Sequence, residues 1–180
     1  MSAIPRRFLA GVAFVAAGAL LAGGLIAGAA LLPVGPWPYV LAWLAIGTGF
    51  VALALASAFN PAARVALAVG AAGWALYALA GASLGLPAEL ALIAAPVAAV
   101  GGLIGAIVLF AERAFAGRLP VAFLATMVVS ALFVLGALGV LTGYVSIMLL
   151  LFAAGLIVTG VLLMRGGTGS QASSPRDAAS

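Results

Sequence analysis

The chain has 180 residues, of which 67% are hydrophobic and 6% are charged, and its net charge is +4. Soluble domains carry about 25% charged residues, so this composition excludes a water-facing surface and predicts an integral membrane protein. Cysteine, histidine and lysine are all absent. Their absence excludes disulfides, thiol and Schiff-base chemistry and ordinary zinc or copper sites, and we predict no cofactor.

Apolar stretches long enough to cross a bilayer follow one another along the chain. About 20 apolar residues span the hydrocarbon core as a helix, and prolines or turn residues interrupt the sequence at about this interval. Because the gaps are short, we predict an all-α membrane protein with six transmembrane helices in antiparallel hairpins. The predicted spans form one domain over residues 1–164, at 8–32, 39–59, 65–86, 90–110, 121–141 and 144–164, and a disordered cytoplasmic tail covers 165–180.

The positive charges indicate how these spans are oriented. Cytoplasmic loops carry an excess of arginine, so we expect both termini in the cytoplasm. Arginine without lysine, beside much alanine and glycine, indicates a bacterial protein and therefore the inner membrane. Nucleic acid is not a predicted partner, because its binding needs several clustered phosphate contacts. The seven arginines precede the first span or follow the second, fourth and sixth: Arg6, Arg7, Arg64, Arg113, Arg118, Arg165 and Arg176.

Two features leave alternatives open. Residues 1–7 resemble the basic region of a signal peptide, and residues 27–29 resemble a cleavage site. The apolar run at 8–32 is longer than the 7–15 or so residues of a signal peptide, which favours a retained helix. Residues 23–26 and 101–104 share the sequence Gly-Gly-Leu-Ile. This similarity indicates either an inverted repeat of three spans, as in many transporters, or chance recurrence.

Small residues at helical spacing predict close helix packing, because glycine lets helix backbones approach each other in lipid. Three pairs of glycines four residues apart fit either a homo-oligomer interface or, as we favour, packing within one bundle. Pro96 lies in the middle of the fourth span and removes a backbone hydrogen bond. With Gly101 and Gly102 it forms a candidate hinge, for which a static kink is the alternative. The packing pairs are Gly24 with Gly28, Gly81 with Gly85, and Gly101 with Gly105.

Polar side chains inside the spans are few. The N–H of Trp74 and the O–H of Tyr77 are costly to bury in lipid without partners. Hydroxyl groups on the second and fifth spans are the available partners. If these groups converge, they form either a structural hydrogen-bond cluster or a ligand site. The candidate cluster consists of Thr48, Trp74, Tyr77, Thr126 and Ser130.

Asn60-Pro61-Ala62 follows the second span and matches the three-residue box of aquaporins. No second box follows the fifth span, and no re-entrant half-helix has room, so a water channel is not predicted. Helix capping explains the three residues better. Asn60 accepts a hydrogen bond at the start of the third span, and Pro61 occupies its first turn.

Glycine-rich second helices in three successive hairpins resemble those of HdeD-like acid-resistance membrane proteins. The resemblance rests on residues 47–50, 101–105 and 155–160, with Pro33 and Pro87 after the first and third spans. The turn between the fifth and sixth spans lacks the matching proline. The resemblance implies a non-enzymatic inner-membrane protein linked to stress, without defined catalytic residues.

The spans contain no ionisable side chain other than tyrosine. Proton relays, ion-coupled transport and intramembrane hydrolysis depend on such groups, so we predict that the protein is not an enzyme. The leading hypothesis is a non-catalytic membrane protein, either structural and stress-related or an accessory subunit that contacts other membrane subunits or itself. The alternative is a small transporter or substrate-binding subunit for an apolar or neutral solute.

Overall fold

A computed structural model describes residues 6–56, 59–82, 87, 89–115 and 117–168. This part of the chain is all-α, and its six long helices are each long and apolar enough to cross a membrane, which confirms the predicted fold class. The elements are α1 (Arg6–Ala29), α2 (Trp37–Ala54), α3 (Pro61–Gly81), α4 (Glu89–Ala111), α5 (Leu119–Ala137), the short 3₁₀ helix η1 (Thr142–Tyr144) and α6 (Val145–Thr168).

Several helix boundaries differ from the predicted ones. Helix α1 ends three residues early because Leu31, with φ of 57°, turns the chain into the left-handed region. Helix α3 begins four residues early, since the Asn60 side chain accepts a hydrogen bond from the Ala62 N–H at 2.8 Å and Pro61 follows it in the first turn. This cap confirms the capping interpretation of the aquaporin-like residues.

The predicted disordered tail begins too early. Helix α6 continues from Val145 to Thr168, so residues 165–168 are helical. Arg165 lies in the last turn of this helix, where a positive charge interacts favourably with the carbonyl end of the helix dipole. No proline interrupts the helix before Pro175. The rest of the predicted tail lies outside the described residues.

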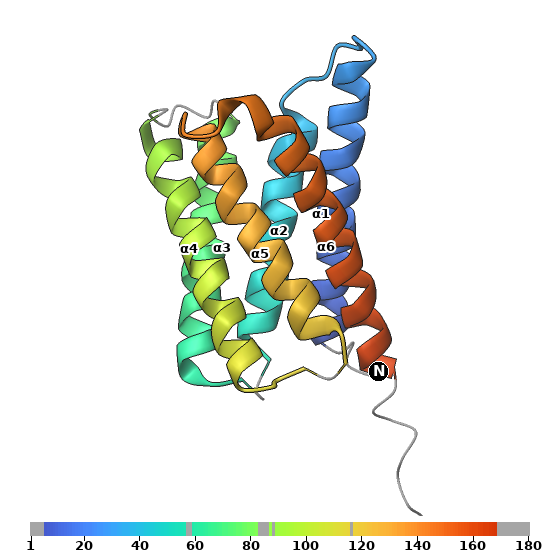
Figure 1. The fold of residues 1–180 in the computed structure, drawn as a ribbon, viewed down its shortest axis with the longest axis vertical. Coiled ribbons are helices and arrows are strands. Elements are labelled where there is room, and N and C mark those ends of the chain that lie inside the picture. The colour runs from blue at the N-terminus through green and yellow to red at the C-terminus, as the bar shows by residue number, and fades with distance from the viewer. Residues whose placement is uncertain (1–5, 57–58, 83–86, 88, 116, 169–180) are drawn as a thin grey trace, which may run out of the picture.

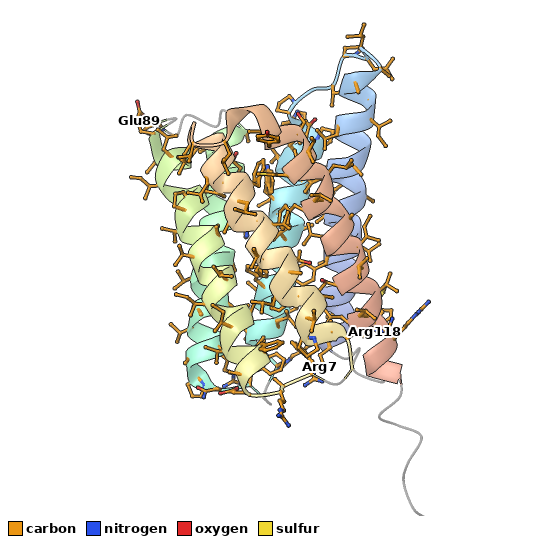
Figure 2. All side chains as sticks on the ribbon, viewed as in Figure 1. Arg7, Glu89 and Arg118 are labelled. Atoms are coloured by element: carbon orange, nitrogen blue, oxygen red, sulfur yellow. The ribbon has the colours of Figure 1, made fainter. Side chains whose placement is uncertain are left out.

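The six helices form a closed ring. Each helix packs against its neighbours in sequence, and α1 also packs against α6. Figure 1 shows the helices running alternately up and down, with the start of α1 and the end of α6 at the same end of the bundle. We call this end, where Arg7 and Arg118 lie, the arginine end, and Figure 2 shows Glu89 at the opposite end.

Aromatic side chains fill the centre of the ring. Phe14 of α1 packs edge-on against Phe50 of α2, with ring centroids 5.8 Å apart, and is stacked against Phe123 of α5 at 6.2 Å. Trp74 of α3 and Phe152 of α6 are also fully buried. Each aromatic pair adds about 0.5–1.5 kcal/mol beyond the burial of its surface. The centre of the described bundle is therefore a packed core rather than a pore.

Two helix pairs are in backbone contact through glycine. A Cβ atom added to Gly160 of α6 would lie 2.5 Å from the Gly11 carbonyl oxygen of α1. A Cβ atom on Gly101 of α4 would lie 2.5 Å from the Gly70 nitrogen of α3. No real Cβ atom tolerates such distances, so only glycine permits these crossings. The α1–α6 and α3–α4 contacts hold the ring closed on both sides of the aromatic core.

Candidate functional site

A chamber lined with aromatic side chains opens at the end of the bundle opposite the arginines. It has a volume of about 390 Å³ and lies between α2, α3, α5 and α6. Its position follows from the helix ends that surround it, which are the starts of α2 and α6 and the ends of α3 and α5. We call it the aromatic chamber. Its lining residues are Pro36, Tyr39, Val40, Trp43, Tyr77, Gly81, Phe133, Ala137, Val145 and Leu149.

Stacked rings at the bottom of the aromatic chamber separate it from the rest of the core. Trp43 and Trp74 are stacked with centroids 4.8 Å apart and ring planes 5° from parallel. Tyr77 packs edge-on against both rings, at 5.4 Å from Trp43 and 6.0 Å from Trp74. Phe152 packs against both indole rings, at 6.0 Å from Trp74 and 6.4 Å from Trp43. A molecule in the chamber would therefore rest on a rigid aromatic surface.

Tyr39 forms a wall between the aromatic chamber and a second cavity. The second cavity, of about 490 Å³, is lined by residues of α1 and α6 together with Tyr39. The Tyr39 ring lies against Gly24, where an added Cβ atom would be 3.0 Å from the ring carbon that carries the hydroxyl. Tyr39 therefore lines both cavities.

The structure separates the five residues of the predicted polar cluster. Trp74 and Tyr77 lie together at the chamber, as their shared helix face implied. Thr48, however, is exposed on the outside of α2, and its hydroxyl donates to the Leu44 carbonyl at 2.9 Å. Thr48 therefore does not belong to the cluster. The reason is helical geometry, since the buried face of α2 carries Trp43 and Phe50 and points Thr48 towards lipid.

Thr126 and Ser130 lie in a different contact, between α5 and α6. Thr126 is buried, donates to the Ala122 carbonyl at 2.7 Å and lies 3.1 Å from the hydroxyl of Thr159. Gly155 makes room for it, because a Cβ atom there would be 2.7 Å from the Thr126 hydroxyl oxygen. Ser130 is buried, and its hydroxyl has no hydrogen-bond partner among the described residues. The contacts of Thr126 favour a structural role for its hydroxyl.

Sequence reasoning missed Trp43 and Thr159. Trp43 has the central position in the aromatic stack, with Phe133 at 5.8 Å in addition to Trp74 and Tyr77. The sequence analysis did not single out Trp43, and the packing of α2 against α3 shows that it is buried. Thr159 lies in a glycine-rich stretch of α6. Its separation of 33 residues from Thr126 gave no local signal.

The candidate hinge residues lie between tight contacts. Pro96 is inside α4, which continues on both sides of it, and it lines an outward-facing apolar groove of about 770 Å³ between α3 and α4. Gly101 is in backbone contact with α3, and Gly102 lies against Met127 and Phe50. These contacts favour the static interpretation over a hinge.

The predicted packing glycines fall into two groups. Gly101 and Gly105 lie against α3, and Gly24 lies against Tyr39. Gly28 and Gly81 have no atom within 4 Å of an added Cβ, so they do not mediate contacts within the bundle. A spacing of four residues between glycines therefore did not predict helix contact at these two positions, which lie at the ends of α1 and α3. Gly85 lies outside the described residues.

The arginine end is held by polar contacts between loops and helix ends. Arg6 donates to the Leu55 carbonyl of α2, and the Asn60 amide donates to the carboxylate of Glu112. Arg7 lies over the rings of Phe59 and Phe115. These contacts connect α1, the α2–α3 loop and the α4–α5 loop.

The part of the chain that the structure describes has no group of three or more His, Cys, Asp or Glu residues able to hold a metal ion. No family model, curated protein or solved structure matches the chain. The described lining of the aromatic chamber has two tyrosine hydroxyls, one indole ring and no charged side chain, and it can bind a ligand through stacking, dispersion and hydrogen bonds.

Proposed function

We propose that this protein is a non-catalytic protein of the bacterial inner membrane that binds an apolar or neutral small molecule in the aromatic chamber. The observation that carries the proposal is the lining of this cavity by Tyr39, Trp43, Tyr77 and Phe133 without any charged residue. Concave, mostly apolar sites with a few polar groups are typical of small-molecule binding. The proposed orientation places the chamber on the outer side and both chain ends in the cytoplasm, since every described arginine lies near the opposite end.

Binding rather than continuous conduction fits the packed centre. Trp74, Phe50, Phe123 and Phe152 are fully buried beneath the chamber. A solute could cross the bundle only if these rings separated. The access that needs the least movement is a rotation of Tyr39, which would connect the chamber to the cavity between α1 and α6. The ligand we expect is therefore one that partitions into the bilayer.

The test is to fill the chamber without disturbing the core. Gly81 lines the chamber and has open space around its Cβ position, so Gly81→Phe should block binding while the bundle stays folded. Gly23 also has open space but lies outside the chamber, so Gly23→Phe is the matched control. Binding of neutral aromatic and aliphatic alcohols to the protein in nanodiscs can be measured by saturation-transfer NMR.

We expect saturation transfer from the wild-type protein and from Gly23→Phe, and its loss in Gly81→Phe. Thermal unfolding monitored by circular dichroism should show that both variants are folded. Equal binding by all three proteins would show that the alcohols partition into lipid or bind elsewhere. That result would reject the chamber as the site.

The groove between α3 and α4 supports a second function, that of an accessory subunit. It is the largest of the four cavities described, at about 770 Å³, and Val65, Val97 and Ile104 on its walls are exposed. A transmembrane helix of a partner subunit would fit against such an apolar surface.

The accessory role can be tested by filling the groove. Val97→Trp should abolish co-purification of a partner in mild detergent. Val12→Trp, at an exposed position on α1, should not. A chain that always purifies alone would count against this role.

The resemblance to HdeD-like proteins supports a link to acid stress. A deletion strain should then survive acid challenge less well than the wild type, and the full chain expressed from a plasmid should restore survival. Equal survival of the two strains would reject the link to acid stress, and it would leave the proposed ligand binding in the aromatic chamber open.

A further inference from the structure

A recess at the arginine end has no part in the proposed ligand chamber. It has a volume of about 330 Å³, and three arginines at the ends of three different helices line it. Arg7 lies in the first turn of α1, Arg118 immediately precedes α5, and Arg165 lies in the last turn of α6. These residues are far apart in the sequence. They come together because α1 closes the ring against α6.

Arg7 is already ordered by aromatic rings. Its guanidinium carbon lies 5.3 Å from the ring centroid of Phe59 and 5.4 Å from that of Phe115. The two rings pack edge-on against each other at 5.3 Å and are both buried. A guanidinium that stacks on an aromatic face keeps N–H groups at its edge for an anion. Because the side chain is held in place, binding a ligand costs less conformational entropy.

The charged side chains among the described residues that line the recess are all arginines. Among the described residues, no acidic side chain lines it. Glu112, at the same end of the bundle, accepts a hydrogen bond from Asn60, and Glu89 lies at the opposite end (Figure 2). Phe115, Leu162 and Leu163 supply apolar walls. The recess therefore combines guanidinium groups with an apolar side at the ends of membrane-crossing helices, where phospholipid headgroups lie.

We propose that this recess binds a phosphate group, with the headgroup of an acidic phospholipid as its source. Arginine matches phosphate oxygens with two parallel hydrogen bonds, and basic pockets between transmembrane helices are suited to anionic headgroups. The phosphate lies between Arg7 and Arg118, and the acyl chains leave along Leu162 and Leu163. A soluble phosphate ester or inorganic phosphate would use the same guanidinium groups but not the apolar wall.

The experiment compares lipid binding by the delipidated full chain in neutral detergent. Native mass spectrometry measures the binding of dioleoylphosphatidylglycerol and of dioleoylphosphatidylcholine. We expect the wild-type protein to prefer the anionic lipid by about tenfold, and Arg118→Gln to lose most of that preference, because a charge-assisted contact is removed. Arg113→Gln is the matched control, since Arg113 is exposed at the same end but does not line the recess.

Arg118 is exposed, so its substitution should leave the fold intact. Arg7→Gln gives an independent test, provided that its thermal unfolding shows a folded protein. The proposal is overturned if Arg113→Gln weakens lipid binding as much as Arg118→Gln does, because the effect would then come from overall charge. Equal binding of both lipids by the wild type would overturn the phospholipid source.

Inorganic phosphate distinguishes the two sources of the ligand. If the acidic phospholipid occupies the recess, millimolar phosphate should leave lipid binding nearly unchanged, because the apolar wall contributes to lipid affinity. If phosphate itself binds with an affinity that Arg118→Gln lowers, and the two lipids bind equally, the ligand is a soluble phosphate compound. Neither outcome depends on the aromatic chamber.

Discussion

The two halves of the bundle differ in how their helices meet. In the arginine half, glycines bring backbones into contact, as Gly11 and Gly160 do between α1 and α6. In the opposite half, Gly23, Gly28 and Gly81 have open space at their Cβ positions. The end of α1 extends beyond the neighbouring helices there (Figure 1). The same residue type therefore joins helices at one end and leaves room at the other.

This difference has a physical basis in the lipid environment. Lipid supplies no hydrophobic drive between helices, so association depends on close packing. The helices of the arginine half pack closely through backbone contact. The opposite half also has a backbone contact, between Gly73 of α3 and Ala98 of α4, but rings such as Trp43 and Trp74 fill its centre, and the aromatic chamber opens above them. Changes in the two halves should consequently have different effects on stability.

The largest effect is expected from Trp74→Ala. Trp74 is fully buried and stacks on Trp43, so its loss leaves a large cavity in the aromatic stack. We expect the free energy of unfolding to fall by about 3 kcal/mol, near the lower end of the range for a buried tryptophan because lipid rather than water is the surrounding solvent. Unfolding in mixed micelles with increasing dodecyl sulfate measures the change.

Trp37 provides the control for this substitution. It is 59% exposed at the start of α2, so Trp37→Ala should change the free energy of unfolding little. A Trp74→Ala variant as stable as Trp37→Ala would show that the aromatic stack does not hold this half together.

Glycine-to-alanine substitutions should have opposite signs in the two halves. Gly160→Ala places a Cβ atom 2.5 Å from the Gly11 carbonyl oxygen, and the resulting strain should destabilise the bundle by about 1–3 kcal/mol. Gly28→Ala meets no atom and should stabilise helix α1 by up to about 1 kcal/mol, since alanine has the higher helix propensity. The same micelle unfolding measures both. Two shifts of the same sign would contradict the contrast between the halves.

The smallest effect is expected at Arg7. Its guanidinium lies over Phe59 and Phe115 but is partly exposed, so Arg7→Gln should cost about 1 kcal/mol of cation–π interaction. Arg7→Lys should retain part of the cation–π stabilisation. Arg113→Gln should lower the free energy of unfolding less than either substitution at Arg7. Thermal unfolding in detergent gives the ranking. A variant at Arg113 that costs as much as Arg7→Gln would assign the effect to net charge instead.

The sequence predicted the fold class because the signals for it are local. A run of about 20 apolar residues can only be a helix in lipid, and the turn at Asn60-Pro61 carries its own capping signal, which the structure shows. Helix ends were less accurate because they depend on turns such as the one at Leu31, whose positive φ no sequence pattern indicates. The extension of α6 beyond Arg165 was missed because the change to a Gly- and Ser-rich composition was taken as the end of the helix, although no proline interrupts it before Pro175.

The candidate site was predicted only where residues share one helix face. Trp74 and Tyr77 are three residues apart and do lie together. Which residues of other helices meet them depends on helix rotation and on the order of helices in the ring. Composition does not encode either, so Thr48 was included and Trp43 was not. The sequence also did not show which glycine pairs mediate helix contacts, because that depends on whether another helix lies against them.

The central claim is that the two ends face opposite sides of the inner membrane, with the arginine end in the cytoplasm. The chain contains no cysteine, so single cysteines at Gly35, in the α1–α2 loop, and at Ala62, exposed at the start of α3, can be labelled in the otherwise unchanged protein. A membrane-impermeant maleimide applied to intact cells whose outer membrane is permeabilised should label Gly35→Cys and not Ala62→Cys. Labelling of Ala62→Cys with protection of Gly35→Cys would contradict the orientation.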